Sequence, residues 1–215
     1  MTIAENIARI RANMAAAARE AGRDPKEILL VGASKMNDAA ACREAVAAGI
    51  DALGENRVQE MVQKLEQHAY DGAPLHFIGH LQRNKVKQVV GHVALIQSVG
   101  SLELLDEIEK VAAARGLVQD ILLEVNIGRE AAKSGFAPEK VLPAAEAALE
   151  RTHVRVRGLM TIPPADAQRD ANFRYFQEVQ ALYVDMNQKL FHNELEYLSM
   201  GMSGDYEDAI RAGAT

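Results

Sequence analysis

The feature that most constrains the fold is a repeated alternation between short apolar runs and longer amphipathic stretches. Several runs are continuous rather than alternating, as in parallel strands covered on both faces. The stretches between them have the apolar spacing of helices. This alternation predicts an α/β fold with a parallel sheet. The predicted strands are residues 28–32, 52–54, 75–79, 94–97, 120–127, 154–162 and 195–200. The clearest predicted helices are residues 40–48, 57–67, 102–114, 138–149 and 173–189, and a further helix is predicted at 206–211.

An additional helix is predicted before the first strand, over residues 2–22. Apolar residues recur there at steps of three and four, Thr2 and Glu5 fit a capping box, and Gly22 supplies a stop.

Two closures of the sheet fit this pattern, an open doubly wound sheet or a (β/α)8 TIM barrel. No Gly-x-Gly-x-x-Gly fingerprint follows the first strand, so we favour the barrel. A barrel needs eight strands, and the 215 residues contain seven candidates, so the eighth strand and helix are expected to be missing from this chain. No linker or composition shift divides residues 1–215, which we interpret as one domain.

Composition excludes several classes of protein. The net charge of −6 gives no general attraction to nucleic acid, and the basic run Arg83, Lys85 and Lys87 is better explained as a solvated helix face. No apolar stretch approaches the length of a membrane span, and the first residues do not form a signal peptide. The single cysteine, Cys42, suits a reducing compartment, and the six histidines have no metal-ligand spacing. We therefore expect a cytoplasmic protein without a metal.

Lys35 follows the first predicted strand, at the end of the sheet where barrels place their functional residues. Low-dielectric walls at a barrel mouth would lower the pKa of such a lysine, and its neutral amine attacks carbonyl groups to form a Schiff base. The alternative is a lysine that extends from a strand end into water.

The segment Met202-Ser203-Gly204-Asp205 precedes the predicted helix 206–211. A hydroxyl and free N–H groups at such a place suit a phosphate, although Ser203 alone equally fits a helix cap.

Three other residues at predicted strand ends have two interpretations each. Asn56 suits a contact with a ligand ring or, more simply, the cap of the helix after it. Met160 is more often core filler than a ligand wall. His80 is near the mouth too, and there a satisfied structural histidine is the preferred interpretation.

Six segments of the sequence form one set of motifs. They are 28–35 (ILLVGASK), 53–60 (LGENRVQE), 76–82 (HFIGHLQ), 125–128 (VNIG) with 133–135 (KSG), 157–163 (RGLMTIP) and 198–203 (LSMGMS). Together they resemble consecutive signatures of one family, the YggS/PROSC family of pyridoxal-5′-phosphate (PLP) homeostasis proteins. The resemblance runs in order from about residue 3 to residue 215.

The resemblance implies a barrel like the cofactor-binding domain of alanine racemase, with PLP at its mouth. It implies a Schiff base at Lys35, a phosphate site at Ser203 and Gly204, and cofactor contacts at Asn56 and Met160. Family members continue into an eighth strand that also contacts the phosphate, and without it an open barrel with weak PLP affinity is expected. Thr215 would enter that strand from the opposite, N-terminal face.

Three functions remain open on the sequence. The first, which we favour, is a monomeric PLP carrier that buffers the cofactor and delivers it to apo-enzymes through transient contacts. The second is a PLP-dependent amino-acid racemase, and the third is a phosphate-binding barrel enzyme that uses Lys35 without PLP. Racemisation needs a base on each face of the substrate, and the second base of the related racemases, a tyrosine, comes from a further domain with no counterpart here.

Overall fold

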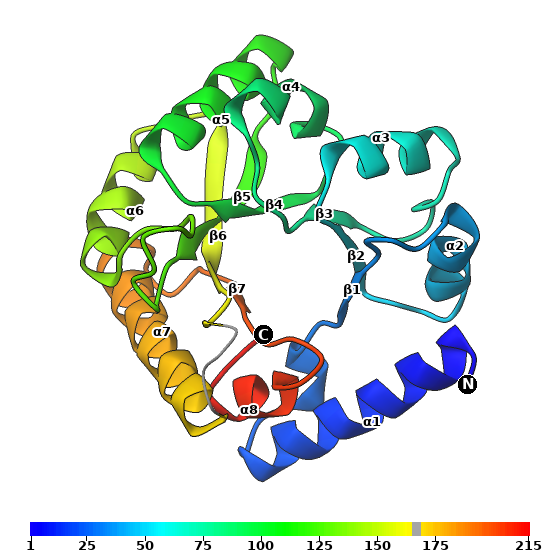
Figure 1. Ribbon diagram of the computed structural model, residues 1–215. Coiled ribbons are helices and arrows are strands. Elements are labelled where there is room, and N and C mark those ends of the chain that lie inside the picture. The colour runs from blue at the N-terminus through cyan, green and yellow to red at the C-terminus, as the bar shows by residue number, and fades with distance from the viewer. Residues whose placement is uncertain (165–168) are drawn as a thin grey trace.

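The structure, a computed structural model, describes residues 1–164 and 169–215, and its seven parallel strands form one strongly curved sheet (Figure 1). All seven predicted strands are present. They are β1 (Val31–Ala33), β2 (Ala52–Glu55), β3 (Leu75–Phe77), β4 (Leu95–Val99), β5 (Gln119–Val125), β6 (Val154–Thr161) and β7 (Tyr197–Ser199).

The order of the strands in the sheet decides between the two predicted closures. Each strand pairs in parallel with the next one along the chain, so the sheet runs from β1 to β7 without a reversal. A doubly wound sheet reverses its order at a switch point. The barrel-type fold is therefore confirmed, as a half-barrel with β1 and β7 at its two edges (Figure 1).

Thr215 lies between these edges. Its main-chain N–H donates to the carbonyl oxygen of Leu198 at 3.1 Å, and its carbonyl oxygen accepts from the N–H of Leu29 at 2.7 Å. Leu29 precedes β1, so this bridge is at the N-terminal ends of the strands, opposite the predicted site. The expected position of Thr215 is confirmed.

The same contact explains why β1 begins at Val31 rather than at residue 28. The N–H of Leu29 is already used by Thr215, and the N–H of Leu30 donates to the Asp51 carboxylate at 2.7 Å. Neither N–H group is left to pair with β2. The Leu30 carbonyl oxygen still accepts from the N–H of Ala52 at 3.4 Å, but regular pairing begins at Val31, so the continuous apolar run is longer than the strand.

Helices cover the outer face of the sheet (Figure 1). The predicted capping box at the first helix is present, since the Thr2 hydroxyl accepts from the N–H of Glu5 and the Glu5 carboxylate accepts from the N–H of Thr2. The basic run Arg83, Lys85 and Lys87 lies on a 3₁₀ turn and a short helix not among the clearest predictions. The helices are α1 (Ile3–Glu20), α2 (Ala39–Ala47), α3 (Val58–Glu66), α4 (Val86–Val89), α5 (Leu102–Arg115), α6 (Val141–Leu149), α7 (Arg169–Leu190) and α8 (Tyr206–Arg211).

Apolar side chains pack on both faces of the sheet, as its continuous apolar runs predict. The main core fills the space between the sheet and the outer helices. A smaller cluster of Leu95, Leu122 and Met160, with Tyr197 packed against it, comes from four neighbouring strands. A third cluster joins α1 to α8, so the N-terminal helix packs beside the last one (Figure 1).

Gly158 permits β6 and β7 to pair closely. A Cβ atom at this position would lie 1.7 Å from the carbonyl oxygen of Tyr197, its partner in register. Gly158→Ala is therefore expected to lower the free energy of unfolding by about 3 kcal/mol, as overpacking against backbone does. Gly204→Ala, where a Cβ atom would meet nothing within 4 Å, is expected to change it by less than about 0.5 kcal/mol. Urea unfolding of both variants is the measurement, and equal stabilities would contradict this account of the β6–β7 contact.

Candidate functional site

Lys35 lies two residues beyond β1, in the turn that leads to α2. The residue is exposed, so the low-dielectric walls expected around it are absent. Within the described parts of the chain its ammonium has no hydrogen-bond or ion-pair partner. The structure thus presents a free primary amine at the C-terminal end of the first strand.

A buried polar cluster lies directly beneath this turn. The carboxylate of Glu55, fully buried at the end of β2, accepts through Oε1 from Lys64 Nζ at 2.6 Å, from the Ser34 hydroxyl at 2.6 Å and from the Tyr70 hydroxyl at 2.9 Å. Burial, and then the neighbouring Glu55 charge, raise the pKa of Tyr70. Burial also raises the pKa of the Cys42 thiol.

Sequence reasoning missed this cluster, although two signals were present. Glu55 is the one charged residue of a strand that is buried throughout. Lys64 follows Val58 and Met61 at helical spacing, on the face of α3 that the core covers. A charge at each of those places indicates a buried ion pair.

Asn56 follows Glu55 at the end of β2. The predicted capping role is wrong, because the N-cap of α3 is Arg57 and no side chain caps that helix. Instead the Oδ1 atom of Asn56 is buried and has no hydrogen-bond partner in the described structure. A Cβ atom at Gly79 would lie 2.2 Å from the Asn56 carbonyl oxygen. The ends of β2 and β3 are therefore packed closely, and Asn56 retains an unused acceptor.

Ser203 and Gly204 form an exposed turn between β7 and α8. The alternative in which Ser203 caps α8 is wrong, since Asp205 is the N-cap residue. The Asp205 carboxylate closes this turn by accepting from the N–H of Met202 at 2.6 Å and from Asn172 Nδ2 at 3.0 Å. In the part of the chain that is described, the N–H groups of Ser203 and Gly204 and the Ser203 hydroxyl have no partner.

Met160 is buried in the cluster with Leu95 and Leu122. It pairs in register with Ser199 of β7, four residues before Ser203. Met160 therefore packs in the core, as one of its two interpretations expects.

Hydrogen bonds between side chains join β3 to its neighbour β4, and β4 to β7, which is three strands farther along the curved sheet. The Ser199 hydroxyl donates to Gln97 Oε1 at 2.7 Å, and Gln97 Nε2 lies 2.9 Å from His76 Nδ1. Because the amide must donate to that ring nitrogen, His76 is neutral, with its proton on Nε2. Burial lowers the pKa of His76 to about 4.

No metal centre is found among the described residues. In that part of the chain, no group of three or more His, Cys, Asp or Glu side chains is arranged to hold a metal ion.

His80 is exposed and lines a pocket of about 510 Å³ with Arg83, Ser98 and Lys133. In the described parts of the chain, no helix is long and apolar enough to cross a membrane.

The fold and the site define a half-barrel of the TIM type with a free lysine after its first strand. Residues 6–214 match the family model described as alanine racemase, N-terminal domain. The chain belongs to this family.

Two curated relatives and one solved structure are similar to it over nearly their whole length. The pyridoxal phosphate homeostasis protein of Aquifex aeolicus is 41% identical, covering 100% of this chain and 94% of the relative. The protein of that name from Pseudomonas aeruginosa is also 41% identical, with 100% and 91% covered. PipY of Synechococcus elongatus, solved with PLP bound, is 30% identical with a TM-score of 0.86, covering 100% of this chain and 95% of PipY. The resemblance to PLP homeostasis proteins is thereby confirmed.

The buried state of His76 predicts a pH dependence of stability. Between its unfolded pKa of 6.5 and its folded pKa of about 4, only the unfolded chain gains a proton. The free energy of unfolding should therefore fall as the pH is lowered through this window, by about 3 kcal/mol from this residue.

Urea unfolding of the wild type and of His76→Gln at pH 7 and pH 4 measures this contribution. The wild type should lose more stability than the variant, and the difference isolates His76 from Glu124, whose pKa burial raises. Equal losses in both proteins would assign the acid sensitivity to other groups.

Proposed function

We propose that this chain binds PLP reversibly through Lys35 and acts in intracellular PLP homeostasis, buffering the cofactor and delivering it to apo-enzymes without turnover of its own. The observation that carries the proposal is the exposed, unpartnered Lys35 after β1, in a chain that resembles a PLP-bound protein over its full length. The relatives are named as homeostasis proteins rather than as enzymes, which supports the carrier function. A cytoplasmic monomer that contacts its recipients transiently fits this role.

The unsatisfied groups of the site fit the chemistry of PLP. The cofactor supplies an aldehyde carbon that amines attack and a ring that stabilises carbanions. Lys35 provides the amine. The free hydroxyl of Ser203 and the two free N–H groups of Ser203 and Gly204 suit the phosphate, since turns with successive free N–H groups bind anions. Asn56 Oδ1 offers an acceptor, and Met160 an apolar wall.

The placement of the five tyrosines argues against a second base for racemisation. The Tyr206 hydroxyl accepts from Asn13 of α1 at 3.0 Å, outside the sheet. Those of Tyr70 and Tyr183 donate to Glu55 and to the Leu195 carbonyl oxygen. Burial raises the pKa of Tyr197, whose hydroxyl lies beside Glu196 and Arg157, and Tyr175 packs against the main core. This arrangement favours a carrier over a racemase.

Lys35→Ala is expected to abolish covalent PLP binding while the fold is kept, because Lys35 is exposed. The measurement is the visible spectrum after PLP loading and desalting, followed by borohydride reduction and peptide mapping. Lys110→Ala, at an exposed site on α5 far along the chain, serves as the control and should bind like the wild type. If the Lys35→Ala variant kept the full visible absorbance of bound PLP, another lysine would have to be the residue that binds PLP.

Carrier and catalyst are separated by two assays on the PLP-loaded protein. Incubation with single-enantiomer alanine or serine should give no sustained appearance of the opposite enantiomer, whereas an enzyme turns over at roughly 1 s⁻¹ or faster. Incubation with an apo PLP enzyme should restore that enzyme's activity and deplete the donor. Sustained turnover without transfer would reverse the assignment.

A further inference from the structure

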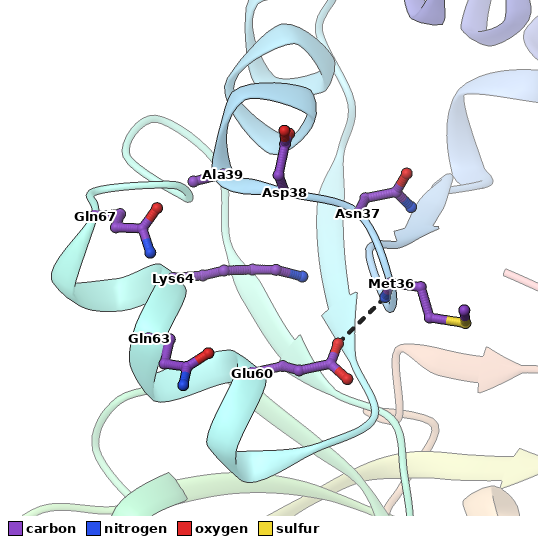
Figure 2. Close-up of a pocket in the computed structure, with 8 residues that line it drawn as sticks. All are labelled: Met36, Asn37, Asp38, Ala39, Glu60, Gln63, Lys64 and Gln67. Carbon is purple, nitrogen blue, oxygen red and sulfur yellow. Dashed lines mark hydrogen bonds between the residues drawn. The ribbon is translucent and has the colours of Figure 1, made fainter.

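The turn that carries Lys35 is held by two side chains of α3. Lys64 Nζ donates to the carbonyl oxygen of Ser34 at 2.8 Å, on the peptide bond that joins Ser34 to Lys35. The Glu60 carboxylate accepts from the N–H of Met36 at 3.2 Å. Figure 2 shows both side chains reaching from α3 toward the loop that contains Met36. The main chain is therefore fixed immediately before and immediately after the lysine.

The backbone between these two contacts is not one that the chain adopts freely. Met36 has a φ of 62°, in the left-handed region that disfavours a side chain. Such a conformation persists only where surrounding contacts over-determine it. Here the N–H of Met36 is bonded to Glu60, and the N–H of Asn37 donates to the same Ser34 carbonyl oxygen that Lys64 binds.

Stability alone does not account for the ion pair between Glu55 and Lys64 behind the turn. Glu55 is fully buried and Lys64 is 7% exposed, and both lose their hydration. Replacing a buried pair of this kind by uncharged residues of similar volume is often neutral or stabilising. What an uncharged pair lacks is the donor that Lys64 directs at the Ser34 carbonyl oxygen.

We infer that Glu55 and Lys64 are positioning residues for Lys35. Glu55 directs Lys64 by accepting from its Nζ atom at 2.6 Å, and Lys64 fixes the Ser34–Lys35 peptide bond, from which the Lys35 side chain extends. The inference rests on the proposed function of Lys35 as the PLP anchor, and it adds the residues that set its geometry.

Three variants separate positioning from stability. Lys64→Met removes the donor but leaves Glu55 as a buried, uncompensated charge. The double variant Glu55→Gln/Lys64→Met removes both charges and is expected to recover most of the thermal stability. Arg151→Met is the matched control. Arg151, which precedes the N-terminal end of β6, also binds a carboxylate and a main-chain carbonyl oxygen, those of Asp106 and Ala147.

Two readouts are taken on each protein beside its melting temperature. Amide hydrogen exchange of the PLP-free protein over residues 34–37 reports the turn itself and needs no cofactor. The rate of borohydride-trapped PLP attachment at Lys35 reports the positioning of the amine. The double variant should exchange faster over residues 34–37 and load PLP about tenfold more slowly or worse, since misplacing a reacting group by 1 Å costs up to about a hundredfold. Arg151→Met should change neither.

The outcomes distinguish this inference from the function on which it rests. A wild type that never loads PLP at Lys35 would contradict the proposed function, while the exchange data would still report the turn. A wild type that loads PLP, beside a stable double variant that loads it equally fast with unchanged exchange, would overturn the positioning role. Slower loading in Arg151→Met, in proportion to its loss of stability, would also overturn it.

Discussion

The site depends on the hydrogen bonds that the buried carboxylate of Glu55 accepts. A charge at the end of β2 with no exposed surface must be compensated by donors. These come from the turn after β1, from α3 and from the segment after α3, namely Ser34, Lys64 and Tyr70. One carboxylate oxygen therefore joins the first two strand–helix units. Because Lys35 follows Ser34 directly, the compensation of this charge also fixes where the Lys35 side chain leaves the sheet.

The two ends of the site are constrained to different degrees. At the lysine end, a buried hydrogen bond from Lys64 and an exposed one to Glu60 hold the backbone on either side of Lys35. At the other end, the turn of Ser203 and Gly204 is closed by the Asp205 carboxylate and is exposed. The two ends come from β1 and β7, the edges of the half-barrel (Figure 1). Under the proposed function, a firmly placed amine would define where PLP attaches, while the exposed phosphate end would allow it to enter and leave.

The fold was predictable from the sequence because its signals are local. Continuous apolar runs predicted all seven strands, and the pair Thr2 and Glu5 predicted the first cap. Local chemistry was less reliable for the exact residue at which a helix begins. Asn56 and Ser203 have the right chemistry for caps, but Arg57 and Asp205 occupy the cap positions. The pairing of Glu55 with Lys64 needs β2 and α3 to be placed first, so spacing alone did not reveal it.

Exposure of Lys35 bears on carrier and catalyst in opposite ways. An enzyme that stabilises a carbanion benefits from closing its site, because excluded water strengthens the electrostatic interactions and suppresses side reactions. Lys35 is instead exposed, and four of the five tyrosine hydroxyls already have partners, that of Tyr70 being the buried Glu55 beneath the turn, while Tyr175 packs against the core. Under the proposed function the same exposure would serve transfer, since the recipient's own amine would have to reach the PLP carbon bound to Lys35. Under the proposed function, a precisely held but uncovered lysine would hold a reactive aldehyde and release it, and would lack the closed site that carbanion chemistry favours.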